Sequence, residues 1–136
     1  MVNQALPLIR YEITDQLTMA TAPCSCPRTG RLIAGISGRL DDVFTYGDVV
    51  VHPHTLRTVM VSHPEVIDYQ IRQRTDGLDV DVLTSGPVPE DLDHDLAAAV
   101  VDQGLAQPTI TLKTVENLER SAASGKLRRF VPLTQP

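Results

Sequence analysis

The segment 120–130 carries the residues with the clearest chemical potential. Small residues and Gly125 precede a lysine, Lys126, and two arginines, Arg128 and Arg129, follow it. A glycine beside the lysine allows a loop that brings one ammonium group into a site, and an ammonium suits charge that develops between a carboxylate and a phosphate. Ser-Gly-Lys is also an ordinary turn sequence. The pattern therefore fits an active lysine or a site for a small anion, and equally a solvated basic end.

Two other segments place charged side chains where predicted elements meet. Residues 38–42 read Gly-Arg-Leu-Asp-Asp, and a junction of this composition fits either a hinge or a solvated turn. Asp15 lies at a predicted strand end, where a carboxylate can accept both hydroxyls of a ribose or cap a turn.

Cys24 and Cys26 are the cysteines of the chain, and they close too small a loop to staple a fold through a disulfide. They could give two thiolates to zinc, but a structural zinc site usually needs four ligands. The four histidines are all distant in sequence. We therefore expect two thiols without metal, with zinc as the alternative. The histidines are His52, His54, His63 and His94.

The chain of 136 residues has the size of one domain, and its formal charge of −5 is unevenly spread. Residues 1–40 sum to +2, residues 41–104 to −10, and residues 105–136 to +3. The acidic middle argues against nucleic-acid binding. We find no apolar stretch long enough to cross a bilayer and no signal-peptide pattern, so we expect a cytoplasmic protein that does not bind membranes.

The elements that must position these residues fall into two parts. Residues 1–37 alternate strand-like runs with the breaker Pro-Cys-Ser-Cys-Pro, which predicts a short all-β segment. We expect residues 16–21 to pair with residues 6–13. Such a piece has little helix to cover it, so one apolar face should stay exposed, and it should pack on another body or self-associate.

Residues 43–115 predict an independent α/β (α+β) fold. A strand at 49–51 runs into a helix that begins at Pro53, and an alternating hairpin with one wet face follows around the turn 75–77. A second helix follows Pro89 and ends at Gly104, and a last strand covers 109–115. This order predicts a small two-layer βαββαβ sandwich.

Taken together, the three charged segments resemble those of a known family. Arg-Tyr-x-x-x-Asp at 10–15, Gly-Arg-Leu-Asp-Asp at 38–42 and Ser-Gly-Lys-Leu-Arg-Arg at 124–129 occur in the order found at the C-terminal end of the adenylate-forming acyl-CoA synthetases. The chain resembles most closely the phenylacetate-CoA ligase-like branch, which has a similar cysteine-pair segment.

The resemblance implies a division into the last strands of a large adenylation domain (1–37), a hinge (38–42) and a small C-terminal lid domain (43–136). It implies a ligase that joins a carboxylic acid to ATP, as its Mg²⁺ complex, and then transfers the acyl group to coenzyme A. Asp15 would hold the ribose, Arg39 would meet ATP phosphate, Asp41 would be the hinge, and Lys126 would be catalytic.

The resemblance also implies a partner, because the phosphate-binding loop and the acid pocket belong to the large N-terminal adenylation domain. We therefore expect the chain alone to be inactive, and the large domain to act with it in cis or in trans. Two other functions remain open from the sequence: a non-catalytic regulatory or partner-binding module that keeps the lid-domain fold, and a zinc-dependent adaptor built on Cys24 and Cys26.

Overall fold

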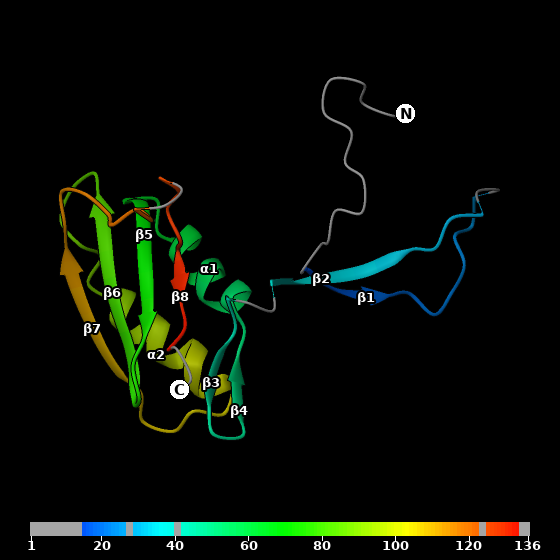
Figure 1. The fold of residues 1–136 in the computed structure, drawn as a ribbon, viewed down its shortest axis with the longest axis horizontal. Helices are drawn as coiled ribbons and strands as arrows, with labels where there is room; N and C mark the ends of the chain where they lie inside the picture. The colour runs from blue at the N-terminus through cyan, green and yellow to red at the C-terminus, as the bar shows by residue number, and fades with distance from the viewer. Residues whose placement is uncertain (1–14, 27–28, 40–41, 123–124, 134–136) are drawn as a thin grey trace. The chain divides into compact units, whose positions relative to one another are not determined.

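The computed structural model describes residues 15–26, 29–39, 42–122 and 125–133 of the chain (Figure 1). The chain divides into two compact units, Met1–Leu40 and Asp41–Pro136. The sequence places its hinge prediction at 38–42, across this division. That these residues act as a hinge stays a prediction.

The first unit is a two-stranded antiparallel ribbon. Strand β1 (Asp15–Met19) pairs with β2 (Ile33–Arg39), from Asp15 opposite Arg39 to Met19 opposite Ile33. The sequence also predicts that residues 16–21 pair with residues 6–13; the latter lie outside the described residues, so this pairing stays a prediction. As expected for a ribbon without a helix to cover it, several large apolar side chains are exposed. They are Leu17, Leu32, Ile33 and Ile36.

The second unit has two helices packed on one face of a four-stranded sheet, whose strand order is β7-β6-β5-β8 (Figure 1). Strands β5 and β6 are antiparallel, whereas β7 pairs in parallel with β6, and β8 in parallel with β5. The elements in chain order are β3 (Phe44–Tyr46), β4 (Val49–Val51), α1 (Pro53–Ser62), β5 (Val66–Gln73), β6 (Gly77–Thr84), α2 (Leu92–Asp102), β7 (Thr109–Thr114) and β8 (Phe130–Val131).

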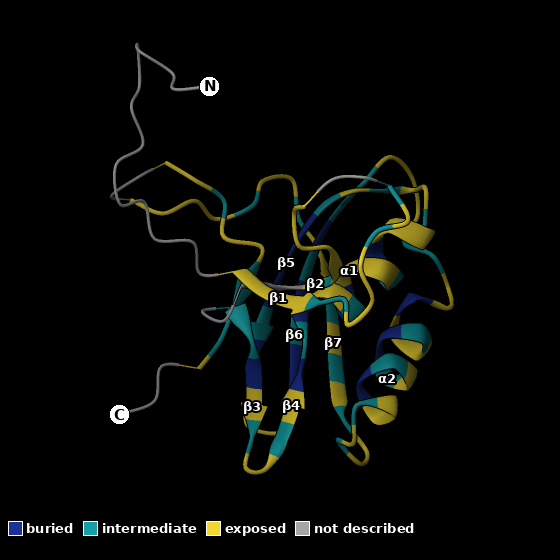
Figure 2. Cartoon of the chain, turned by 90° about the vertical axis from the view of Figure 1, so that its right-hand side faces the viewer, coloured by how far each residue is buried: buried dark blue, intermediate teal, exposed yellow. Residues whose placement is uncertain are grey.

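The helices form where the sequence predicts them. Helix α1 has proline at its first position, where the missing N–H costs nothing, and α2 stops before Gly104, whose φ of 103° suits glycine. Each helix turns an apolar stripe to the sheet (Figure 2). Among the described residues, no helix is both long and apolar enough to cross a membrane. The buried stripe residues are Leu56, Met60, Leu92, Leu96 and Val100.

Strand β4 lies outside the main sheet. Its residues pair with β3 in a separate two-stranded sheet, with Phe44 opposite Val51, instead of joining the main sheet. The place beside β5 is taken by β8, where Ile71 is opposite Phe130. The predicted βαββαβ elements are therefore present, and two short strands, β3 and β8, are added to them.

The alternation of β5 is interrupted at Ile67. The sequence places Ile67 on the apolar face with Tyr69 and Ile71, but its exposed fraction is 61%. The register moves from Val66 opposite Thr84 to Asp68 opposite Leu83, which leaves Ile67 as an extra residue in a β-bulge. A bulge shifts the alternation by one position, so Val66 packs against the core in place of Ile67.

Candidate functional site

Lys126 lies in a short hairpin in the segment of chain that connects β7 to β8. Arg120 and Leu127 form an isolated antiparallel bridge at its base. Within it, the Ser121 N–H donates to the Lys126 carbonyl at 3.0 Å, and the Gly125 N–H donates to the Ser121 carbonyl at 2.8 Å. Gly125 has a φ of 66°, a conformation that glycine adopts without steric cost. The Lys126 side chain is exposed. We call the described residues 120–122 and 125–127 the lysine hairpin.

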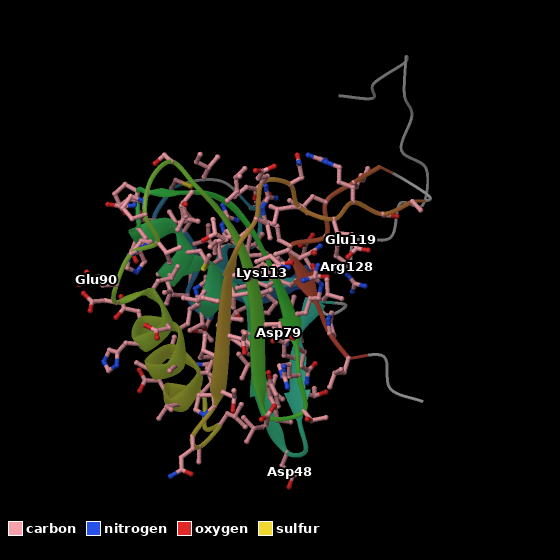
Figure 3. All side chains as sticks on the ribbon, turned by 90° about the vertical axis from the view of Figure 1, so that its left-hand side faces the viewer. Asp48, Asp79, Glu90, Lys113, Glu119 and Arg128 are labelled. Carbon is pink, nitrogen blue, oxygen red and sulfur yellow. The ribbon has the colours of Figure 1, made fainter. Side chains whose placement is uncertain are left out.

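The lysine hairpin is tied to strand β5 by a buried side chain. The Gln70 amide donates to the Glu119 carbonyl at 3.2 Å and to the Arg128 carbonyl at 2.8 Å, one on each side of the hairpin. The next residue, Ile71, donates its N–H to the Arg129 carbonyl at 2.7 Å, where β8 begins. Figure 3 shows Glu119 and Arg128 close together beside the sheet. The base of the lysine hairpin is therefore hydrogen-bonded to β5 on both of its sides.

Charged groups extend this attachment toward the next strand. Arg72 of β5 donates to the Asp81 carboxylate of β6 at 2.6 Å, to the Glu119 carboxylate at 3.2 Å, and to the Gln70 side-chain oxygen. The hydrogen bond that Arg72 donates to Asp81 raises the pKa of the guanidinium, burial opposes this rise, and the charge of Asp81 together with the hydrogen bond and charge of Glu119 adds to it. The sequence predicts that the polar side chains of β5 and β6 face solvent. Gln70 of β5 is instead only 4% exposed.

The two arginines after Lys126 have carboxylate partners within the second unit. Arg129 contacts both oxygens of Asp68, at 2.9 and 3.4 Å. Arg128 contacts Asp42 Oδ1 at 3.3 Å through both Nε and Nη2. The sequence interpretation grouped these arginines with Lys126 as one basic cluster. The structure instead engages both in ion pairs that fix the end of the hairpin.

An aromatic cluster anchors the chain immediately after the hairpin. The Phe130 ring lies edge-on to Phe44 at a centroid distance of 6.3 Å and to Tyr69 at 5.9 Å. Such edge-to-face pairs add about 0.5–1.5 kcal/mol to the burial of the rings. Strand β8 is thereby joined to both β3 and β5.

The other predicted site residues lie near the division between the units. Asp15 is exposed and opens β1, and its Cα partner in the register is Arg39, the last residue of β2. The structure therefore brings these two candidates for nucleotide binding to the same end of the ribbon. Asp41, the predicted hinge residue, lies outside the described residues. Lys126 belongs to the second unit.

Cys24 and Cys26 are both thiols, and their sulfur atoms lie 2.7 Å apart. Within the described ranges, no group of three or more His, Cys, Asp or Glu side chains could hold a metal ion. The histidines that the sequence offered as further ligands are all in the second unit. The donor set that the structure gathers at Cys24 and Cys26 is thus smaller than a structural zinc site requires.

Sequence reasoning did not single out Gln70 or Glu119. Both contact the base of the lysine hairpin, yet they lie 49 residues apart in the chain. A glutamine among the polar positions of an alternating strand reads as solvent-facing. Only the later segment that covers this face makes it a buried polar residue.

Comparisons with known proteins place these observations in context. A search of protein-family models finds no match. The chain is 35% identical over 78 residues to the phenylacetate-coenzyme A ligase of Thermus thermophilus, a match that covers 57% of this chain and 18% of that protein. The chain thus aligns with less than a fifth of that curated relative.

Two solved structures of 2-hydroxyisobutyryl-CoA ligase share the fold. One, in the postadenylation state with R3-HIB-AMP, has a TM-score of 0.59 and 23% identity, and the match covers 93% of this chain and 29% of that one. The other, an open conformation with 2-HIB-AMP and CoA, has a TM-score of 0.55 and 22% identity, and covers 95% and 29%. At this identity the likeness supports the fold alone.

Proposed function

Because this chain resembles, in sequence and in fold, a C-terminal domain of the adenylate-forming acyl-CoA synthetases, we propose that it is the lid portion of an ATP-dependent acid–CoA ligase. It would supply the catalytic lysine and the hinge, and a large adenylation domain, in cis or in trans, would supply the acid pocket and most of the nucleotide site. The chain alone would be inactive.

The observation that carries this proposal is the placement of Lys126. Its side chain is exposed on a hairpin whose base is hydrogen-bonded to Gln70 of strand β5. A lysine that must reach into a site on another body needs this combination of an accessible ammonium and a fixed base.

In the first half-reaction, a carboxylate oxygen of the acid would attack the α-phosphorus of ATP. The bond from that phosphorus to the oxygen that bridges the α- and β-phosphates would break, so that pyrophosphate leaves and an acyl-adenylate is formed. Attack brings two negatively charged groups together. The Lys126 ammonium, aimed between the carboxylate and the α-phosphate, would stabilise this transition state by a few kcal/mol. ATP would enter as its Mg²⁺ complex.

Asp15 and Arg39 would serve the nucleotide. The Asp15 carboxylate would accept hydrogen bonds from both ribose hydroxyls, and the Arg39 guanidinium would bind ATP phosphate. Their opposition in the register of the ribbon supports a common role, since both would then lie along one bound nucleotide.

In the second half-reaction, the coenzyme A thiol would attack the acyl carbon and AMP would leave, giving the thioester. Lys126 must withdraw before the thiol enters, so the second unit would rotate about Asp41 between the two half-reactions.

Complementation in trans tests the proposal. The chain is mixed with the large domain of a phenylacetate-CoA ligase from which the C-terminal domain has been removed, and pyrophosphate release is measured with phenylacetate and ATP. We expect Lys126→Ala to lower release on the order of 100-fold or more. Lys113→Ala is the matched control, because Lys113 is the other lysine of the chain and is exposed on β7.

The two half-reactions separate the roles further. With phenylacetyl-adenylate supplied directly, thioester formation should survive Lys126→Ala. Equal pyrophosphate release from the wild type and Lys126→Ala would reject the lysine assignment. Binding of the large domain without any pyrophosphate release would favour a non-catalytic module.

A further inference from the structure

We infer that Gln70 is a positioning residue for Lys126, because its side-chain amide binds both ends of the lysine hairpin at once. The inference concerns how the hairpin is held. Its importance for catalysis rests on the proposed function.

The Gln70 amide is buried, and both its nitrogen and its oxygen have hydrogen-bond partners. Only 4% of the residue is exposed. The two N–H groups donate to the Glu119 and Arg128 carbonyls, and the side-chain oxygen accepts from Arg72.

Arg72 sets the orientation of this amide. An arginine has only donors, so it can face the Gln70 oxygen but not its nitrogen. Arg72 is in turn held by the Asp81 carboxylate on β6, at 2.6 Å. The Gln70 nitrogen is thereby directed at the two carbonyls that flank the hairpin. The chain of contacts runs from β6 through Arg72 and Gln70 to both ends of the hairpin.

No other residue type of this size offers the same contacts. An apolar side chain would leave two carbonyls without the donors that Gln70 supplies, and a glutamate would place a carboxylate oxygen against two carbonyl oxygens. Losing these two partly buried hydrogen bonds is unfavourable. We expect the hairpin to detach from β5 for part of the time, so that the position of Lys126 relative to the sheet is no longer fixed.

Hydrogen exchange of the full chain, read residue by residue by NMR, tests the inference. The probes are the Ser121 and Gly125 amides, both bonded within the hairpin. We expect Gln70→Met to lower their protection at least tenfold, while Val80 and Val82 in β6 keep theirs. The control is Gln73→Met. Gln73 is also buried on β5, but it bonds the Thr45 carbonyl and the Leu133 N–H instead of the hairpin.

Three results would overturn the inference: unchanged hairpin protection in Gln70→Met, an equal loss of it in Gln73→Met, and an equal loss throughout β6. The last would mean that Gln70 supports the whole sheet.

A second variant gives a signature that a merely structural role would not produce. In Gln70→Glu the introduced carboxyl has no donor when ionised and one O–H donor when protonated. Hairpin protection relative to the wild type at the same pH should therefore be lower at pH 7 than at pH 4. In Gln70→Met it should not depend on pH. The wild-type reference is needed because Asp81 and Glu119 also take up protons. A loss independent of pH in Gln70→Glu would contradict hydrogen-bond donation as the cause.

The activity arm is read separately. In the complementation assay, Gln70→Met should lower the turnover of adenylation at least tenfold and leave the KM for ATP within about twofold, since the side chain would act on the position of Lys126 and not on nucleotide binding. If Lys126→Ala is without effect, the proposed function fails, while the exchange experiment still decides the role of Gln70. Suppose that Lys126→Ala abolishes pyrophosphate release and that Gln70→Met lowers hairpin protection. Unchanged turnover in Gln70→Met would then refute a role of Gln70 in positioning Lys126.

Discussion

Replacing Gly77 by alanine should strongly destabilise the second unit, because the added methyl group would clash with the backbone of the neighbouring strand. Gly77 opens β6 and lies opposite Thr109 of β7 in the parallel pair. A Cβ built at Gly77 would lie 1.9 Å from the Thr109 carbonyl oxygen, 2.6 Å from its nitrogen and 2.7 Å from its carbonyl carbon. All three atoms are backbone, so no side chain can move aside.

The size of the effect follows from these distances. To reach 3.0 Å, the shortest separation that real Cβ atoms show, the two strands must move apart by about 1.1 Å. Overpacking of this kind costs about 3 kcal/mol. The neighbouring bond from the Thr109 N–H to the Asp76 carbonyl, 2.9 Å long, would stretch as well. For a unit of this size, we expect Tm to fall on the order of 10 °C or more.

Thermal and urea unfolding followed by circular dichroism measure the change. Gly86→Ala is the matched control, because a Cβ at Gly86 meets nothing within 4 Å. The control should stay within about 0.5 kcal/mol of the wild type. A Gly77→Ala protein as stable as Gly86→Ala would refute the close approach of β6 and β7.

Three further predictions concern the hairpin, the alkaline range and the start of the second unit. Gly125→Ala, at a φ of 66°, should cost about 1 kcal/mol and lower the amide protection of the hairpin, with Gly125→Asn less affected; equal protection in the two would contradict the assigned conformation. Burial, and then the charge of Asp76, raises the pKa of Tyr46, whose hydroxyl donates to the Gly77 carbonyl at 2.8 Å. Its neutral form is therefore favoured in the fold, and the resulting stability is complete below the unfolded pKa of about 10 and is lost as pH rises further. Unfolding from pH 9 to 11 should show a shallower decline in Tyr46→Phe than in the wild type, and parallel curves would reject this account. Asp42→Asn should cost less than about 0.5 kcal/mol, because the Arg128 partner is half exposed, and 1 M salt should remove the difference; a loss that salt leaves unchanged would show that the contact is not mainly electrostatic.

The regular elements of the second unit could be predicted because local patterns determine them. Leu92, Leu96 and Val100 recur at helical spacing, and a glycine follows where the helix ends. The short strands β3 and β8 could not be found in this way. A two-residue strand has no periodicity of its own, and the partner of Phe130 is Ile71, far earlier in the chain.

The candidate site was predictable in its residue types but not in its contacts. The sequence singled out Lys126, whose side chain is exposed, and it predicted exposed apolar side chains in residues 1–37, which the described residues of this segment contain. It did not reveal that Arg128 and Arg129 pair with Asp42 and Asp68, because the partners are 86 and 61 residues apart. Alternation shows which side chains share a face of a strand, and a later segment decides whether that face meets water.

The contacts of Phe130 have a mechanical consequence. Through the packing of Phe130 on Phe44, with a smaller contribution from the half-exposed ion pair between Arg128 and Asp42, the end of the lysine hairpin is attached to the residues where the second unit begins. If the second unit rotates about Asp41, the rotation acts first on the residues that contact the end of the lysine hairpin. The Lys126 ammonium would then move together with the second unit, so that an error in the angle of rotation displaces the ammonium in proportion to its distance from Asp41.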